Sequence, residues 1–131
     1  MAATQKIFFD GTKANGRVQV RVDLAADADE HRIDISGFGD SGETATVKCR
    51  VQVERIRWCQ ASAGVIVLGW DSDEDDDNDE LIMTLYGNGH WYNDFALKSS
   101  IAQPNHSDIF ISAAKPATVI LDLRKLAGYT N

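Results

Sequence analysis

The sequence predicts an all-β fold, an antiparallel β-sandwich of jelly-roll or related type with about eight strands. Short segments rich in valine, isoleucine and aromatic residues recur along the chain, and turns rich in glycine and aspartate separate them. None of these segments has the 3.6-residue period of an amphipathic helix. The 131 residues, of which 44% are hydrophobic, suit a single domain spanning residues 1–131.

The first three strands are expected at residues 5–10, 17–24 and 31–36. The second is the clearest, because apolar residues at its even positions alternate with polar or charged residues at its odd positions. This period of two predicts a strand with one face in the core. In the third strand, Ile33 and Ile35 are expected to point inward.

Residues 44–60 form the longest expected strand. Apolar residues occupy its odd positions from 47 to 53, whereas Ile56 and Trp58 continue the pattern on even positions. One extra residue in a strand reverses which side chains face inward. The change of phase at Glu54 and Arg55 therefore predicts a β-bulge.

The two cysteines, Cys49 and Cys59, lie on either side of this phase change. Cys49 shares the inward face with the valines, and Cys59 is expected to point away from the core. Both are expected to be free thiols, the default in a reducing compartment, and a disulfide between them is the less favoured alternative. Their spacing matches no CxxC redox or zinc pair.

Residues 64–70 and 81–86 are apolar on both strand faces. Such strands lie in the centre of a sandwich, or another subunit covers one of their faces. The dipeptide Asn88-Gly89 predicts a hairpin turn after the second of them. The final strands are expected at residues 108–112 and 118–125.

Between the two apolar segments, residues 71–80 read DSDEDDDNDE, in which eight residues are acidic. The formal net charge is −7 for the whole chain and +1 without this segment. Like charges repel one another and resist burial, so the segment is expected to be a loop projecting from the body. It is interpreted as a solvated connection, a cation site or a contact for a basic partner, and the partner-binding candidates are Asp73, Glu74, Asp75, Asp76 and Asp77.

Acidic residues at every second position from 71 to 77 match the first ligands of a helix–loop–helix calcium site. The match then fails, because Asp76 stands at the required glycine position and Ile82 at the position of the bidentate glutamate. We therefore expect no dedicated metal site and no cofactor.

Catalytic motifs are not apparent in the sequence. Nucleotide-binding glycine motifs and a nucleophile elbow are absent, and no two of the three histidines have metal-ligand spacing. The protein is thus expected not to be an enzyme. Nucleic acid is not expected as a partner, because the acidic segment would repel phosphate. Neither is a membrane, because no apolar run approaches the ~18 residues that a span needs.

Aromatic residues are the other binding candidates. Trp58 and Trp70 are expected in the core. Trp91 and Tyr92 are adjacent in a strand and must point to opposite faces, so one of them is expected to be exposed or at an interface. Either could contact a partner or a sugar.

The order of several motifs carries a resemblance. These motifs are I-x-W at residues 56–58, Trp70-Asp71 after an apolar strand, an acidic residue before Leu81, Gly87-x-Gly89 followed by Trp91, Asp-Ile-Phe-Ile at 108–111, and an apolar–charged strand at 119–125. In this order the C-terminal half resembles a group of small structural proteins from tailed bacteriophage virions, often from marine or environmental phages. The resemblance implies a β-sandwich that joins a particle as a repeated subunit, on the capsid surface or at the neck or tail.

The function expected is therefore that of a non-enzymatic virion structural protein, a capsid cement or decoration subunit made in the host cytoplasm. The alternatives are a carbohydrate-binding jelly-roll module and a calcium-dependent binding domain. The expected partners are further copies of the chain, in a homo-oligomer such as a trimer, and a viral shell or neck protein. Ile82 is expected on the outer face of its strand, where it would contact such a partner.

Overall fold

The computed structural model of the chain describes residues 3–11, 16–39, 41–44, 47–71, 80–99, 101, 107–126 and 128–129, with the backbone alone for residues 93–96. Within these ranges the chain forms nine strands and one short 3₁₀ helix, η1. Their bounds are β1 (Thr4–Asp10), β2 (Arg17–Leu24), β3 (Asp29–Ile33), η1 (Ile35–Gly37), β4 (Val51–Gln60), β5 (Val65–Asp71), β6 (Glu80–Tyr86), β7 (Gly89–Lys98), β8 (Asp108–Ala113) and β9 (Ala117–Lys125). The described part of the chain contains no helix with the length and apolarity needed to cross a bilayer.

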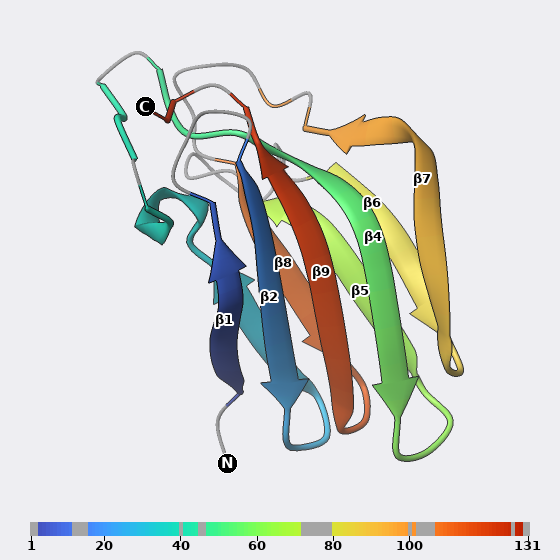
Figure 1. The fold of residues 1–131 in the computed structure, drawn as a ribbon. Coiled ribbons are helices and arrows are strands. Elements are labelled where there is room, and N and C mark those ends of the chain that lie inside the picture. The colour runs from blue at the N-terminus through green and yellow to red at the C-terminus, as the bar shows by residue number, and fades with distance from the viewer. Residues whose placement is uncertain are drawn as a thin grey trace.

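The strands form two antiparallel sheets with jelly-roll topology. Strand β5 pairs with β6, β4 with β7, β3 with β8, and β2 with β9, as in a long ribbon folded back on itself. The pairings of β4 with β9 and of β5 with β8 then roll this ribbon into a sandwich. Sheet A has the order β1-β2-β9-β4-β7, and sheet B has the order β3-β8-β5-β6. Figure 1 shows sheet A in front of sheet B. The expected all-β sandwich is confirmed.

The core lies between the two sheets. Along β2 and β9, buried residues alternate with less buried ones from end to end, so the expected inward faces of both strands are confirmed. Each fully buried aliphatic side chain stabilises the fold by roughly 1.5–3 kcal/mol relative to exposure. Those with no exposed surface include Val20, Val22, Ile33, Val53, Ile56, Ile66, Leu68, Ile109, Ile111, Val119, Leu121 and Leu123.

The expected bulge in β4 is confirmed, but the strand is shorter than predicted. Its register with both β7 and β9 shifts between Val53 and Arg55. The strand begins at Val51, seven residues later than the pattern indicated. Val47 therefore lies outside the strand, where its N–H donates to the Thr44 hydroxyl, and its side chain is 40% exposed.

The third strand also ends earlier than expected. It begins at Asp29 and ends at Ile33, and η1 follows. Asp34 causes this ending, because its carboxylate accepts hydrogen bonds from the N–H and the hydroxyl of Ser36. Ile33 and Ile35 are both buried, so the prediction for these two side chains is correct.

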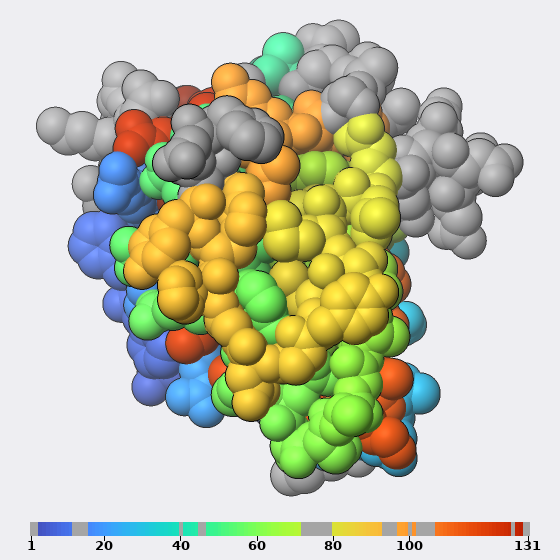
Figure 2. Space-filling model, turned by 90° about the vertical axis from the view of Figure 1, so that its right-hand side faces the viewer, coloured from blue at the N-terminus to red at the C-terminus, as the bar shows by residue number. Residues whose placement is uncertain are grey.

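The turn at residues 87–88 does not close a hairpin. It leads from β6 in sheet B to β7 in sheet A, and β7 pairs with β4. Side chains of β4 fasten this crossing: the Trp58 indole N–H donates to the carbonyl of Tyr86, and the Gln60 amide donates to that of Gly87. Figure 2 views the sandwich from this edge, where β6 and β7 lie side by side. Asn88-Gly89 predicted a turn, but the dipeptide could not predict which strand β7 pairs with.

A buried lysine joins three separate segments at the opposite end of the sandwich. The ammonium group of Lys125 lies 2.6 Å from the carbonyl oxygens of both Gly11 and Gly39, and 2.7 Å from the Asp10 carboxylate. It also lies 5.2 Å from the ring centroid of Tyr129. These contacts attach the end of β1 and the segment after η1 to the last strand.

Candidate functional site

The acidic candidates Asp73 to Asp77 lie outside the described residues, but both ends of their segment are described. Asp71 ends β5, where it is buried and forms an ion pair with Arg32 of β3. Glu80 begins β6 and pairs with Trp70. The acidic segment therefore leaves sheet B at the end of β5 and re-enters it at the start of the neighbouring strand β6.

The expectation that Ile82 lies on the outer face is wrong. The register between β5 and β6 shifts after Leu68, so Met83 and Leu81 have partners in β5 and Ile82 is the extra residue. Ile82 is partly buried and packs against the core. Leu81 is instead the exposed residue of this pair, with 66% of its surface accessible.

The expectation for the adjacent aromatic pair is confirmed. Trp91 is partly buried and packs against the core. Tyr92 points out from sheet A and is 56% exposed. Of the tryptophans expected in the core, Trp70 is buried, and Trp58 is partly buried against it.

The outer face of sheet B carries several large apolar side chains. Alternate residues of β5, β6 and β8 form this surface, because their neighbours in sequence point into the core. Leu81 and Tyr86 on β6 are 66% and 70% exposed. Thr84 and Ser112 lie on the same surface, on either side of Val67. We call this surface the apolar face after its large apolar residues, which are Val65, Val67, Leu81, Tyr86 and Phe110.

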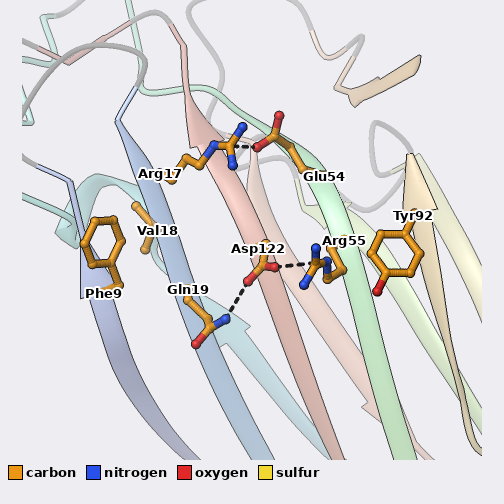
Figure 3. Close-up of a pocket in the computed structure, with 8 residues that line it drawn as sticks. All are labelled: Phe9, Arg17, Val18, Gln19, Glu54, Arg55, Tyr92 and Asp122. Carbon is orange, nitrogen blue, oxygen red and sulfur yellow. Dashed lines mark hydrogen bonds and ion pairs between the residues drawn. The ribbon is translucent and has the colours of Figure 1, made fainter. Parts of the chain in front are cut away.

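The outer face of sheet A is charged, and two carboxylates organise it. Glu54 lies 3.3 Å from the guanidinium of Arg17 and 3.1 Å from that of Arg124. Asp122 accepts a 2.8 Å hydrogen bond from the Gln19 amide and lies 3.5 Å from Arg55. Figure 3 shows Arg17, Gln19, Glu54, Arg55 and Asp122 meeting across β2, β9 and β4.

Tyr92 extends this charged cluster to the edge strand β7. The guanidinium carbon of Arg55 lies 4.5 Å from the centroid of the Tyr92 ring, close enough for a cation–π interaction. The ring of His90 meets that of Tyr92 edge to face, with centroids 5.2 Å apart. Tyr92 is thus held between two neighbours.

Two hollows lie along this face and share Tyr92. The first, of about 360 Å³, extends from Phe9 across the Arg17, Glu54, Arg55 and Asp122 cluster. The second, of about 480 Å³, extends past His90 and Trp58 to Asn88. We call the two together the sheet A groove. The charged lining of the groove was not identified from the sequence, because it assembles only through the register of β2, β9 and β4.

Metal-binding geometry is absent from the described residues, in which no three His, Cys, Asp or Glu side chains are placed to hold an ion. His31 shares a 2.7 Å hydrogen bond with the Gln5 side chain. Burial lowers the pKa of His31, and the nearby Asp29 partly offsets this effect. His106 lies outside the described residues.

Both cysteines are free thiols on the faces that the sequence predicted. Cys49 is buried, donates to the carbonyl of Gly128 over 3.2 Å and lies 3.4 Å from the Ser41 hydroxyl. Burial raises the pKa of its thiol. Cys59 is exposed and borders the second hollow of the sheet A groove.

Comparisons with protein-family models, with curated proteins and with solved structures find no match to this chain. The functional argument therefore depends on the two outer faces of the sandwich.

Proposed function

We propose that the protein is a non-enzymatic structural subunit of a bacteriophage virion, a cement or decoration protein of the capsid. The observation that carries this proposal is the apolar face of sheet B. The jelly-roll fold supports it in a general way, because this architecture serves in viral capsids as well as in lectins.

The apolar face has the composition of an interface centre. Leu81 and Tyr86 are largely exposed, and the half-buried Val65, Val67 and Phe110 lie beside them. Large contiguous apolar patches are uncommon on monomers and mark places where another subunit docks. Glu30 and Arg32 on the neighbouring strand β3 supply the polar rim that such interfaces have.

The occupant we propose for this face is another subunit of the particle, either the shell protein or a further copy of the chain. A homo-oligomer with closed symmetry, such as a trimer at a three-fold position, would bury the face in every copy. The acidic segment at residues 71–80 leaves sheet B beside this face. Binding to a basic shell surface should therefore weaken as salt concentration rises.

Co-sedimentation with capsids of the parent phage tests the proposal. Leu81→Asp places a charge in the apolar face without touching the core, so this variant should stay in the supernatant while the wild type pellets. Tyr92→Ala, which alters an exposed residue of the opposite sheet, should pellet like the wild type. Light scattering on the same samples gives the oligomeric state. A wild type that is monomeric and does not pellet with capsids would contradict the proposal, and so would a Leu81→Asp variant that still pellets.

A carbohydrate-binding module is the second candidate, and the sheet A groove favours it. The groove contains an exposed aromatic ring next to fixed polar groups, which is the combination that sugars need. It lies on the opposite side of the sandwich from the apolar face, so the two proposals do not compete for one surface. The calcium-dependent alternative rests on residues 71–80, and no described group of side chains supports it.

A further inference from the structure

We infer that the sheet A groove is a binding site for neutral polysaccharide chains, with Tyr92 as the platform on which one sugar ring stacks. This inference rests on the carbohydrate-binding candidate of the preceding subsection and specifies its ligand class and binding residues, and it does not depend on the virion role. It follows from the position of one aromatic ring, from the pairing of the charged groups around it, and from the length of the groove.

Tyr92 has the properties of a stacking platform. It is 56% exposed and lies in β7 where the pairing with β4 shifts register. Figure 3 shows its ring nearly face on in the view onto the outer face of sheet A. Arg55 and His90 contact the ring and restrict its motion. A restrained ring loses little conformational entropy when a ligand binds.

The polar groups beside the ring are fixed before any ligand arrives. Asp122 is held by Gln19 and Arg55, and Glu54 is held by Arg17 and Arg124. Each of these ion pairs uses the Nε atom of its arginine. A guanidinium carries five N–H donors, so donors on the terminal nitrogens remain for a ligand hydroxyl.

The paired charges of the first hollow favour a neutral ligand. Arg17 and Arg55 face Glu54 and Asp122 there, while Arg124 pairs with Glu54 beside it and Arg57 lines the second hollow. An anionic polymer would meet two carboxylates, and a cationic one would meet the arginines. The hydroxyl groups of a neutral sugar both donate and accept hydrogen bonds, so they can use carboxylate and guanidinium groups side by side.

The two hollows suit a chain rather than a single sugar. They meet at Tyr92, and together they extend from Phe9 at β1 to Asn88 at the start of β7. The second hollow has a more apolar border, with Trp58 and Ile120. A Cβ atom at Gly89 would lie 3.0 Å from the Trp58 ring, so a larger residue would crowd this border.

Native affinity electrophoresis tests the site without capsids. Gels would contain hydroxyethylcellulose, galactomannan, dextran or a soluble β-1,3-glucan as neutral polymers, and polygalacturonate as an acidic one. At least one neutral polymer should retard the wild type, and 0.5 M salt should not abolish the retardation. Retardation by none of the neutral polymers, or by polygalacturonate alone, would overturn the inference.

Variants of two exposed tyrosines locate the site. Tyr92→Ala should weaken binding about tenfold or more, which is the loss expected on removing a central aromatic contact. Tyr92→Phe keeps the ring and should retain most of the affinity. Tyr86→Ala, on the apolar face of sheet B, is the matched control and should bind like the wild type. Equal retardation of Tyr92→Ala and the wild type would place binding elsewhere and refute the inference.

Asp122→Asn tests the polar part of the groove separately. The substitution preserves shape and removes the acceptor charge that Gln19 and Arg55 orient. Binding should weaken several-fold, while circular dichroism and the melting temperature report an intact fold. Undiminished binding by this variant would show that the cluster does not contact the ligand.

Discussion

Two exposed tyrosines illustrate how the strand pattern assigns residues to opposite sides of the molecule. Tyr86 ends β6 on the outer face of sheet B, and Tyr92 lies in β7 on the outer face of sheet A. The turn between these strands carries the chain from one sheet to the other. Residues close in sequence therefore lie on two different surfaces. A substitution of either tyrosine is thus a control for a substitution of the other.

The cysteines allow a test of the inward and outward faces at single residues. Only the thiolate reacts with alkylating reagents. Cys49 is buried, and the pKa of its thiol is raised. Cys59 should therefore react in native protein faster than Cys49 by a factor on the order of ten or more, since Cys49 must wait for local opening. Mass spectrometry after timed labelling with iodoacetamide measures both rates, and urea should make them similar. Equal rates in native protein would contradict the burial of Cys49.

At the scale of strands, the sequence predicts faces well where only one face is apolar. The alternation in β2 and the phase change in β4 were both readable, because polar residues mark the outer face. Strand β6 gives no such signal, since apolar residues occupy both of its faces. Its bulge at Ile82 was therefore missed, and the outward residue proved to be Leu81.

The site was partly predictable for a related reason. Adjacent aromatic residues must point to opposite faces, so one of Trp91 and Tyr92 was expected to be exposed. The charged cluster beside Tyr92 could not be predicted. Tyr92 meets Arg55 only through the register of β7 with β4, and Arg55 meets Asp122 only through that of β4 with β9. Such registers depend on long-range pairing, which local patterns do not encode.

Strand β9 also holds the ion pair between the buried Lys125 and the half-buried Asp10 at one end of the sandwich. Replacing Lys125 with methionine would leave the Asp10 carboxylate and two backbone carbonyls without their shared donor. Breaking such a pair costs about 3–5 kcal/mol. We expect Lys125→Met to lower the free energy of unfolding by this amount in urea denaturation.

Lys115→Met is the matched control for this prediction. Lys115 pairs with Asp27 over 3.1 Å, but both side chains are exposed, and exposed pairs contribute about 0–1 kcal/mol. The urea midpoint of the Lys115→Met variant should remain close to that of the wild type. A similar loss in the two variants would mean that burial does not set the strength of the Lys125 pair.

At the scale of the whole molecule, the sandwich presents two unlike faces. Sheet A carries ion pairs and a groove, whereas sheet B carries the apolar face, and the acidic segment leaves sheet B at the end of β5. If sheet B docks on a particle, sheet A faces away from it. A subunit attached in this way would display its groove to the surroundings, so particle assembly and sugar binding could coexist in one domain.

Hydroxyl-radical footprinting of free and capsid-bound protein tests most directly whether sheet B docks on the particle and sheet A faces away from it. Tyrosine side chains react readily when exposed, so Tyr86 and Tyr92 should both be oxidised in the free protein. On capsids, Tyr86 should become protected together with Leu81, while Tyr92 keeps its reactivity. Protection of Tyr92 with Tyr86 unchanged, or protection of neither residue, would contradict docking through sheet B.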